Sequence, residues 1–357
     1  MSPVRRESNR LRVLVFSGAG ASYAVNPERF PTTVQFFQKL PVGLAKEPLV
    51  TILRDRCERR FGKGPADVEK ILWCLSELEQ YFLAIDDAKS PMNWVAEGNV
   101  IQSAVGSPHH GISEFVHLAR LARNKVIAIK DTIAAEVYNF YSYKPKSEEL
   151  IDNWIQLLQS LHTHKAWIDL VTTNYDLVLE TTVKLLKLEV GNGFSDEPVR
   201  EMSLDYWRNS ISTENVEPYA DGLITKLHGS VHWEAEPDGV VLGGTRYKGA
   251  HERHALISPG FKGVPQKEPF VTLHDYFERA LTRADVILFI GFAFRDDYIN
   301  DLIRRSVGNK QIVCIDPSPL SWVPTYVRDK IFHIERGFDG DAIREFWKFV
   351  DRTQRAN

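Results

Sequence analysis

The stretch VLVFSGAGAS, from Val13 to Ser22, decides the fold of this chain. Its first four residues are apolar without alternation, which is typical of a strand buried on both faces of a parallel sheet. A glycine-rich turn and a predicted helix follow, an arrangement that brings backbone and helix N-terminus close to a pyrophosphate. The third glycine of the dinucleotide fingerprint would fall where Tyr23 stands. A tight connection without any ligand therefore stays open as the alternative.

Three later runs repeat this buried-strand pattern, namely Trp167 to Val171, Val286 to Ile290 and Gln311 to Ile315. Each run ends in a small or polar residue. In an open parallel sheet, ligands bind beyond the carboxyl ends of the strands. We therefore expect an α/β fold, a Rossmann-like parallel sheet flanked by helices, with the segments after all four runs facing one crevice.

A large helical insertion is predicted between the first two strands. Apolar residues recur at spacings of three and four from Phe115 to Phe140, and similar patterns cover Asp67 to Ile85 and Glu148 to Leu161. We assign residues 60–165 to this insertion, and residues 1–60 and 165–357 to the nucleotide-binding domain. Residues 190–275 are punctuated by glycine and proline, which predicts short strands and loops.

Composition narrows the classes of function. The chain has 357 residues and a net charge of −3, so no bulk charge draws it to nucleic acid or to a membrane surface, and no direct nucleic-acid binding is expected. The longest later apolar run, Val286 to Phe294, is too short for a membrane helix. The three cysteines, Cys57, Cys74 and Cys314, form no Cys-x-x-Cys pair, which fits a reducing cytoplasm and argues against a cysteine zinc site.

Polar motifs follow two of the apolar segments. Thr172-Thr173-Asn174-Tyr175-Asp176 ends the second strand, where Asn174 and Asp176 are suited to ribose hydroxyls and a carboxamide. The alternative for Asp176 is that it caps the helix that follows. His228 comes after the apolar pair Leu223-Ile224 and precedes a glycine, and an imidazole there could exchange a proton with a ribose hydroxyl or water.

Two further motifs end the later strands. Gly291 directly follows a buried strand and could bring its N–H to a phosphate, while Asp296 and Asp297 could begin the next helix. Asp316 is placed to bond to a ribose, or alternatively to form a turn before Pro317. The His228–His232 spacing could bind a metal on a helix, but the region is predicted as loop or strand, no third ligand is evident, and we predict no metal site.

Taken in order, these five segments resemble the sirtuin superfamily, and most closely the zinc-free sirtuin-like domains of bacterial antiphage defence systems. The resemblance covers roughly residues 10–40 and 165–320 and leaves the helical insertion unmatched. It implies NAD as the substrate, with catalytic roles for Asn174, His228 and Asp176. The cofactor-binding residues that it implies are Gly18, Ala19, Gly20, Ser22, Thr173, Gly291 and Asp316.

One departure bears on the activity. Protein-deacylating sirtuins hold a structural zinc with two Cys-x-x-Cys pairs, which this chain lacks, so no zinc is expected. What remains is cleavage of the nicotinamide–ribose bond through a transition state that resembles an oxocarbenium ion. We hypothesise that Asn174 positions the ribose or the water, that Asp176 orients the carboxamide and that His228 is the general base. A protein deacylase and a non-catalytic sensor of NAD or ADP-ribose stay open as alternatives.

The resemblance also implies partners. It suggests an antiphage effector that depletes NAD, assembles into a homo-oligomer and works with a HerA-type translocase ATPase or an Argonaute-like protein. A chain that is nearly all catalytic domain offers no obvious sensor of its own, which makes such a partner reasonable.

Overall fold

The computed structural model describes residues 4–5, 10–32, 35–61, 68–87, 90, 112–145, 151–195, 200–212, 216–217, 221–237, 239–243, 254–256, 265, 267–308, 310–320 and 323–356. Within these residues the centre of the molecule is a seven-stranded sheet in the order β12-β11-β10-β2-β3-β6-β4, and every neighbouring pair is parallel. Its strands are β2 (Arg12–Ser17), β3 (Trp167–Thr172), β4 (Val190–Gly191), β6 (Gly222–Lys226), β10 (Val286–Ile290), β11 (Gln311–Ile315) and β12 (Ile331–Ile334).

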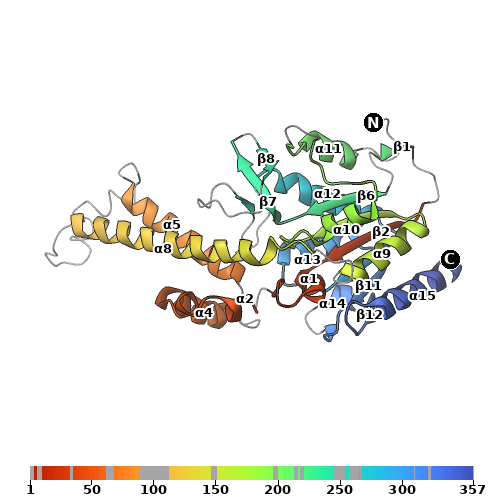
Figure 1. The fold of residues 1–357 in the computed structure, drawn as a ribbon, viewed down its shortest axis with the longest axis horizontal. Coiled ribbons are helices and arrows are strands. Elements are labelled where there is room, and N and C mark those ends of the chain that lie inside the picture. The colour runs from red at the N-terminus through yellow and green to blue at the C-terminus, as the bar shows by residue number, and fades with distance from the viewer. Residues whose placement is uncertain are drawn as a thin grey trace.

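Successive side chains of each inner strand enter two different cores. In β2, Val13 and Val15 belong to one buried cluster, and Leu14 and Phe16 belong to the other. Helices cover both faces, as Figure 1 shows. The first face packs against α1 (Ala19–Val25), α9 (Asp152–Thr163), α10 (Val178–Leu186) and α15 (Gly340–Ala356), and the second against α11 (Leu204–Ser212), α12 (Phe270–Arg283), α13 (Asp297–Ser306) and α14 (Thr325–Arg328). The predicted fold class, a Rossmann-like parallel sheet flanked by helices, is confirmed.

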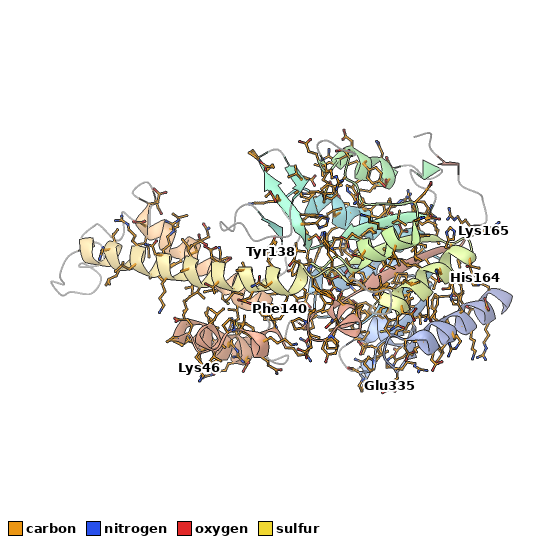
Figure 2. The ribbon with its side chains drawn as sticks, viewed as in Figure 1. Lys46, Tyr138, Phe140, His164, Lys165 and Glu335 are labelled. Carbon is orange, nitrogen blue, oxygen red and sulfur yellow. The ribbon has the colours of Figure 1, made fainter. Side chains whose placement is uncertain are left out.

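The long segment between β2 and β3 is helical. It contains α2 (Phe36–Lys39), α3 (Val42–Ala45), α4 (Pro48–Phe61), α5 (Val68–Asp86) and α8 (Ile112–Tyr141), before α9. We call α4, α5 and α8 the helical arm, since α5 and α8 pack side by side and extend away from the sheet (Figure 1). Figure 2 places Tyr138 and Phe140 at the end of α8 nearest the sheet, and Phe140 packs edge-on against Phe36. The division into domains stays a prediction.

The region from 190 to 275 holds the predicted short strands but also more order than expected. A three-stranded antiparallel sheet, β8-β7-β9, is made of β7 (Gly229–Glu236), β8 (Gly239–Leu242) and β9 (His254–Leu256). A two-residue strand, β5 (Val216–Glu217), pairs with β1 (Val4–Arg5). The short strand β6 joins the central sheet, and helix α11, which the prediction of short strands and loops did not include, also lies here.

Two of the cysteines lie together although they are distant in sequence. The Sγ atoms of Cys57 in α4 and Cys74 in α5 are 3.6 Å apart, and none of the three cysteines, all of which the structure describes, forms a disulfide. The spacing in sequence gave no sign of this contact, because two separate helices create it.

Candidate functional site

The carboxyl ends of β2, β3, β6, β10 and β11 lie at one edge of the sheet, because the strands are parallel and adjacent. The strand order changes direction at β2, which has β3 on one side and β10 on the other. The loops after β2 and β10 meet there: Gly18 N–H donates to the carbonyl of Ile290 at 3.0 Å, and Gly20 N–H donates to that of Gly291 at 3.0 Å. Ligands of open α/β sheets bind at such a switch point.

Gly18, Gly20 and Gly291 let these two loops touch through their backbones. Gly291 has a φ of +56°, and a Cβ added to it would lie 2.4 Å from the backbone nitrogen of Ala21. A Cβ on Gly18 would lie 2.6 Å from the carbonyl oxygen of Gly291. The contact between the two loops therefore leaves no room for a side chain at these positions. The glycine motif by itself does not reveal this requirement.

The same contact uses backbone donors that the sequence assigned to a phosphate. The N–H of Gly291 donates to the carbonyl of Ile315 at 3.1 Å, as those of Gly18 and Gly20 do to the neighbouring loop. Ala19 is the first residue of α1, and the hydroxyl of Ser22 lies within α1 and is buried. A phosphate at this loop would thus have to be met by groups other than the Gly291 N–H.

Asn174 connects the end of β3 to the glycine loop. Its Nδ2 donates to the carbonyl of Gly18 and to Ser22 Oγ, both at 2.8 Å, and its backbone N–H donates to Thr172 Oγ1 at 3.0 Å. The amide hydrogens therefore hold the loop in place. The remaining polar atom of the side chain, Oδ1, is an acceptor, so Asn174 would meet a water or a hydroxyl group through that oxygen.

Asp176 is buried and has protein donors at both oxygens. Oδ2 accepts from Ser22 Oγ at 2.6 Å, and Oδ1 accepts from the N–H of Val178, the first residue of α10, at 3.0 Å. Burial raises the pKa of its carboxyl, although Lys226 and Ser22 oppose that shift. This geometry matches the alternative that Asp176 supports the start of the next helix, and it adds a link to α1 that the sequence did not indicate.

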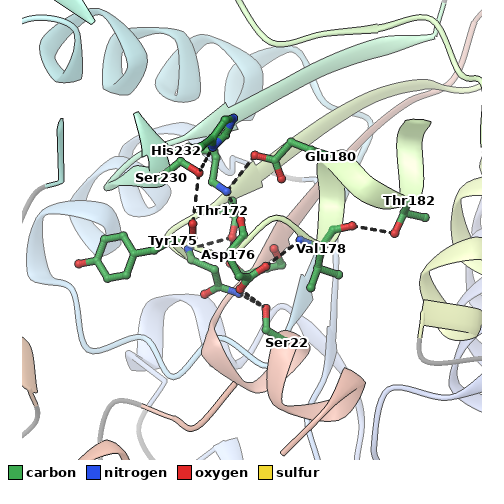
Figure 3. A network of polar contacts seen from close by, with 12 residues as sticks. Ser22, Thr172, Tyr175, Asp176, Val178, Glu180, Thr182, Ser230 and His232 are labelled. Carbon is green, nitrogen blue, oxygen red and sulfur yellow. Dashed lines mark hydrogen bonds and ion pairs between the residues drawn. The ribbon is translucent and has the colours of Figure 1, made fainter. Parts of the chain in front are cut away.

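Lys226 belongs to the polar network around this turn. Figure 3 shows that network, with Asp176, Glu180 and His232 labelled. The buried Nζ of Lys226 donates to the backbone carbonyl of Asp176 and lies 3.0 Å from Glu180 Oε1. Ser230 Oγ donates to the carbonyl of Tyr175 at 3.2 Å and lies 2.8 Å from His232 Nδ1. Burial, together with the charges of Lys226 and Lys144, lowers the pKa of His232 to about 3, so this histidine is neutral at physiological pH. The role of Lys226 was not predicted, although a lysine at the end of an apolar segment is a usable signal.

His228 occupies the turn between β6 and β7, next to the end of β3. Leu227 N–H donates to the carbonyl of Thr172 at 2.9 Å, so the His228 and Asn174 segments are neighbours. The side chain is 4% exposed, and its Nε2 lies 3.4 Å from Asp296 Oδ2. Asp296 is the N-cap of α13, as the alternative for that motif predicted. Its contact with His228 was not predicted.

Thr173 and Asp316 lie at the same edge of the sheet. Thr173 N–H donates to the carbonyl of Ser17 at 3.4 Å. Asp316 follows β11, whose last carbonyl receives the Gly291 N–H, and its Oδ1 accepts from the N–H of Ser318 at 2.8 Å. Asp316 therefore forms a turn, which was the alternative prediction for this residue. It lies in the loop after β11, next to the loop after β10. The structure thus brings all of the predicted site residues to one edge of the sheet.

Two features are absent from the described residues. They contain no group of three or more His, Cys, Asp or Glu side chains suited to a metal ion, and no helix among them is long and apolar enough to span a bilayer. A cavity of about 320 Å³ lies elsewhere, between β12 and α15, and is lined by Phe332, Arg336, Asp341, Arg344, Glu345, Lys348, Phe349 and Arg352. None of the motif residues lines it.

Comparison with known families matches part of the chain to one family model. Residues 169–319 match the SIR2-like domain. The matched segment begins within β3 and ends after β11, so it includes Asn174, Asp176, His228, Gly291 and Asp316. No curated protein matches the chain.

Solved structures of Sir2 proteins are similar to this chain at low sequence identity. One is a triple-mutant Sir2 homologue in complex with 2′-O-acetyl ADP-ribose, with 14% identity, a TM-score of 0.40, and coverage of 96% of this chain and 92% of that one. A second is a mutant Sir2 homologue in complex with ADP-ribose, with 14% identity, a TM-score of 0.39 and coverage of 97% and 94%. A third, described as the structural basis for the mechanism and regulation of Sir2 enzymes, has 9% identity, a TM-score of 0.37 and coverage of 97% and 95%.

Proposed function

We propose that this chain is an NAD glycohydrolase, which breaks the bond between nicotinamide and ribose and transfers the ribosyl carbon to water. The products are nicotinamide, ADP-ribose and a proton. The observation that carries the proposal is the position of Asn174, which is tied to the Gly18 loop through two hydrogen bonds and stands beside the turn of His228. The SIR2-like match over residues 169–319, which contain Asn174 and His228 but not the Gly18 loop, supports it.

Hydrolysis of the nicotinamide–ribose bond places three requirements on the protein. The dinucleotide must be held, positive charge developing on the ribose must be tolerated, and a water must be oriented and deprotonated. Asn174 Oδ1 is placed to accept a hydrogen bond from that water or from a ribose hydroxyl. His228 supplies the base, since an imidazole exchanges protons near neutral pH. Ser22 and Asp176 hold the loop on which Asn174 depends.

The test is incubation of the purified chain with NAD, followed by chromatographic separation of the products. Asn174→Ala and His228→Ala are each expected to reduce nicotinamide release by about 100-fold or more, the usual size of a lost acid–base or positioning group. The exposed residues Asn209 and His164 supply matched controls, since Asn209→Ala and His164→Ala remove the same side-chain types away from the site. Full activity in both site variants would overturn the assignment.

The biological role belongs to the same proposal. Depletion of NAD suits an antiphage effector, and an effector needs a trigger, so we include in the proposal a homo-oligomer or a partner such as a HerA-type ATPase or an Argonaute-like protein. The assay is therefore run with and without the product of the neighbouring gene. NAD bound tightly but left intact in the assembled complex would favour a sensor, and strong stimulation of nicotinamide release by an acetyl-lysine peptide would favour a deacylase.

A further inference from the structure

We propose that Asp296 is a positioning residue for His228, and that it joins the helix α13 to the proton-transfer step of the function proposed above, on which this inference rests. The two side chains come from separate loops, one after β6 and one after β10. His228 Nε2 and Asp296 Oδ2 are 3.4 Å apart, and the side chains are 4% and 5% exposed. A carboxylate and an imidazole that are both removed from water interact more strongly than an exposed pair does.

The two carboxylate oxygens of Asp296 have separate tasks. Oδ1 accepts from the backbone N–H groups of Tyr298 and Ile299, each at 3.1 Å, which makes Asp296 the cap of α13. Oδ2 faces the imidazole of His228. An N-cap needs only one acceptor oxygen, so capping of α13 does not account for the contact between Oδ2 and His228.

The carboxylate is held firmly in this position. Asn300 Nδ2 donates to the carbonyl of Phe294 at 2.8 Å, and Asn300 N–H donates to that of Asp296 at 2.9 Å, so both sides of the loop are tied to α13. Ile299 and Ile303 in the same helix are fully buried against the sheet. Asp296 therefore moves only if α13 moves.

A buried carboxylate beside a histidine does two things for proton transfer. It sets the orientation of the ring, and it stabilises the imidazolium that forms when the ring accepts a proton. The contact of 3.4 Å is long for a hydrogen bond, and such contacts often shorten when substrate is bound. Loss of the carboxylate should therefore slow the chemical step more than it weakens substrate binding.

The deciding variant is Asp296→Asn. Asparagine is as good an N-cap as aspartate, so the contact to α13 is kept, whereas an amide nitrogen in place of Oδ2 cannot accept from the ring. Asp296→Ser keeps a capping oxygen and removes the second group altogether. Asp297→Asn is the matched control, because it changes the same charge on the exposed neighbouring residue.

We expect kcat for nicotinamide release to fall about 30-fold or more in Asp296→Asn and Asp296→Ser, with KM within about threefold of the wild type. Asp297→Asn should retain the wild-type kcat. Thermal midpoints of all three variants are measured alongside, so that a folding defect is seen directly. A kcat within threefold of the wild type in a folded Asp296→Asn protein would overturn the proposal.

A spectroscopic measurement separates this inference from the proposed function. In protein labelled with 15N-histidine, the ring signals of His228 are assigned by their absence in His228→Gln. Asp296→Asn should shift both ring nitrogens, and Asp297→Asn should not. If the wild type does not cleave NAD, the proposed function is wrong, but a shift of the His228 signals still shows that Asp296 and His228 interact. If Asp296→Asn leaves the His228 signals unmoved, the pairing is wrong even in an active enzyme.

Discussion

The loop edge of the sheet and the helical arm are built in different ways. At the loop edge, backbones touch one another at Gly18 and Gly291, and polar side chains such as Asn174 link one loop to the next. In the arm, α5 and α8 pack through apolar side chains, among them Leu75 and Ile133, and carry ion pairs at the surface. Apolar contacts can be replaced by others of similar volume. Backbone contacts and directed hydrogen bonds cannot, so the loop edge should tolerate far less change than the arm.

The largest expected difference is between two glycine substitutions. Gly291→Ala places a methyl group 2.4 Å from the backbone of Ala21 at a φ of +56°, so the two loops must separate. We expect the free energy of unfolding to fall by more than about 3 kcal/mol. Gly43→Ala in α3 has open space around it and should stabilise the chain by up to about 1 kcal/mol. Urea denaturation of both variants measures this contrast, and equal stabilities would break the comparison.

A second contrast concerns two carboxylates whose pKa values are shifted in opposite directions. Burial raises the pKa of Asp169 in β3, which accepts from Tyr276 Oη at 2.5 Å and Trp167 Nε1 at 3.1 Å. The hydrogen bond from Arg120 lowers the pKa of Asp86 in the arm. The pKa of Asp169 is about 4 in the unfolded chain and higher in the folded chain. Its ionisation therefore lowers the free energy of unfolding as the pH rises from the first pKa through the second. The Asp86 carboxylate raises the free energy of unfolding above about pH 4, the pKa in the unfolded chain. This contribution is lost as the pH falls through the lower pKa of Asp86 in the folded chain.

Substitution by asparagine should separate these two effects. Asp169→Asn keeps an oxygen that can accept from both donors. The free energy of unfolding of this variant, relative to that of the wild type, should be higher at pH 8 than at pH 4. Asp86→Asn should show the reverse, being relatively less stable at pH 8. The measurement is the free energy of unfolding in urea at the two pH values. The same direction of change in both variants would contradict this account.

The last contrast concerns the reactivity of a side chain in the arm and not the stability of the chain. Burial, and secondly Cys57, raises the pKa of the Cys74 thiol to about 12. Since the thiolate is the nucleophile, its amount at pH 8 is about 1000-fold lower than for an ordinary thiol of pKa near 9. Alkylation of Cys74 by iodoacetamide should be correspondingly slow in the folded chain and fast in guanidinium, as followed by mass spectrometry. Rapid labelling of the folded chain would show that the α4–α5 contact opens readily.

Much of the fold could be predicted from local pattern. The strands β10 and β11 match the predicted ranges, and β2 and β3 extend theirs by one or two residues, because buried parallel strands are continuously apolar. Helix α8 was also evident from its periodicity. Strand β6 was not among the four runs predicted for the parallel sheet, because it begins with a glycine and ends with Thr225 and Lys226, which are buried in the fold yet polar in sequence.

The candidate site was only partly predictable. Motif residues at the ends of strands were expected at one edge, and they lie there. The partners of those residues were not foreseen, since Lys226 reaches Asp176, and Asp296 reaches His228, across loops far apart in sequence. Such contacts depend on the order of strands in the sheet, and nothing in the local spacing of residues encodes that order.

The sequence by itself determined the α/β class, the helical segment between the first two predicted strands, and the residues that end β2, β3, β10 and β11. These follow from periodicity and from the conformations that glycine, asparagine and aspartate allow, which are local properties. Only the tertiary structure decided that Gly18 and Gly291 pack against each other, and that His228 faces Asp296. Those choices depend on burial and on the adjacency of β2 and β10, which arise only when the whole sheet has assembled.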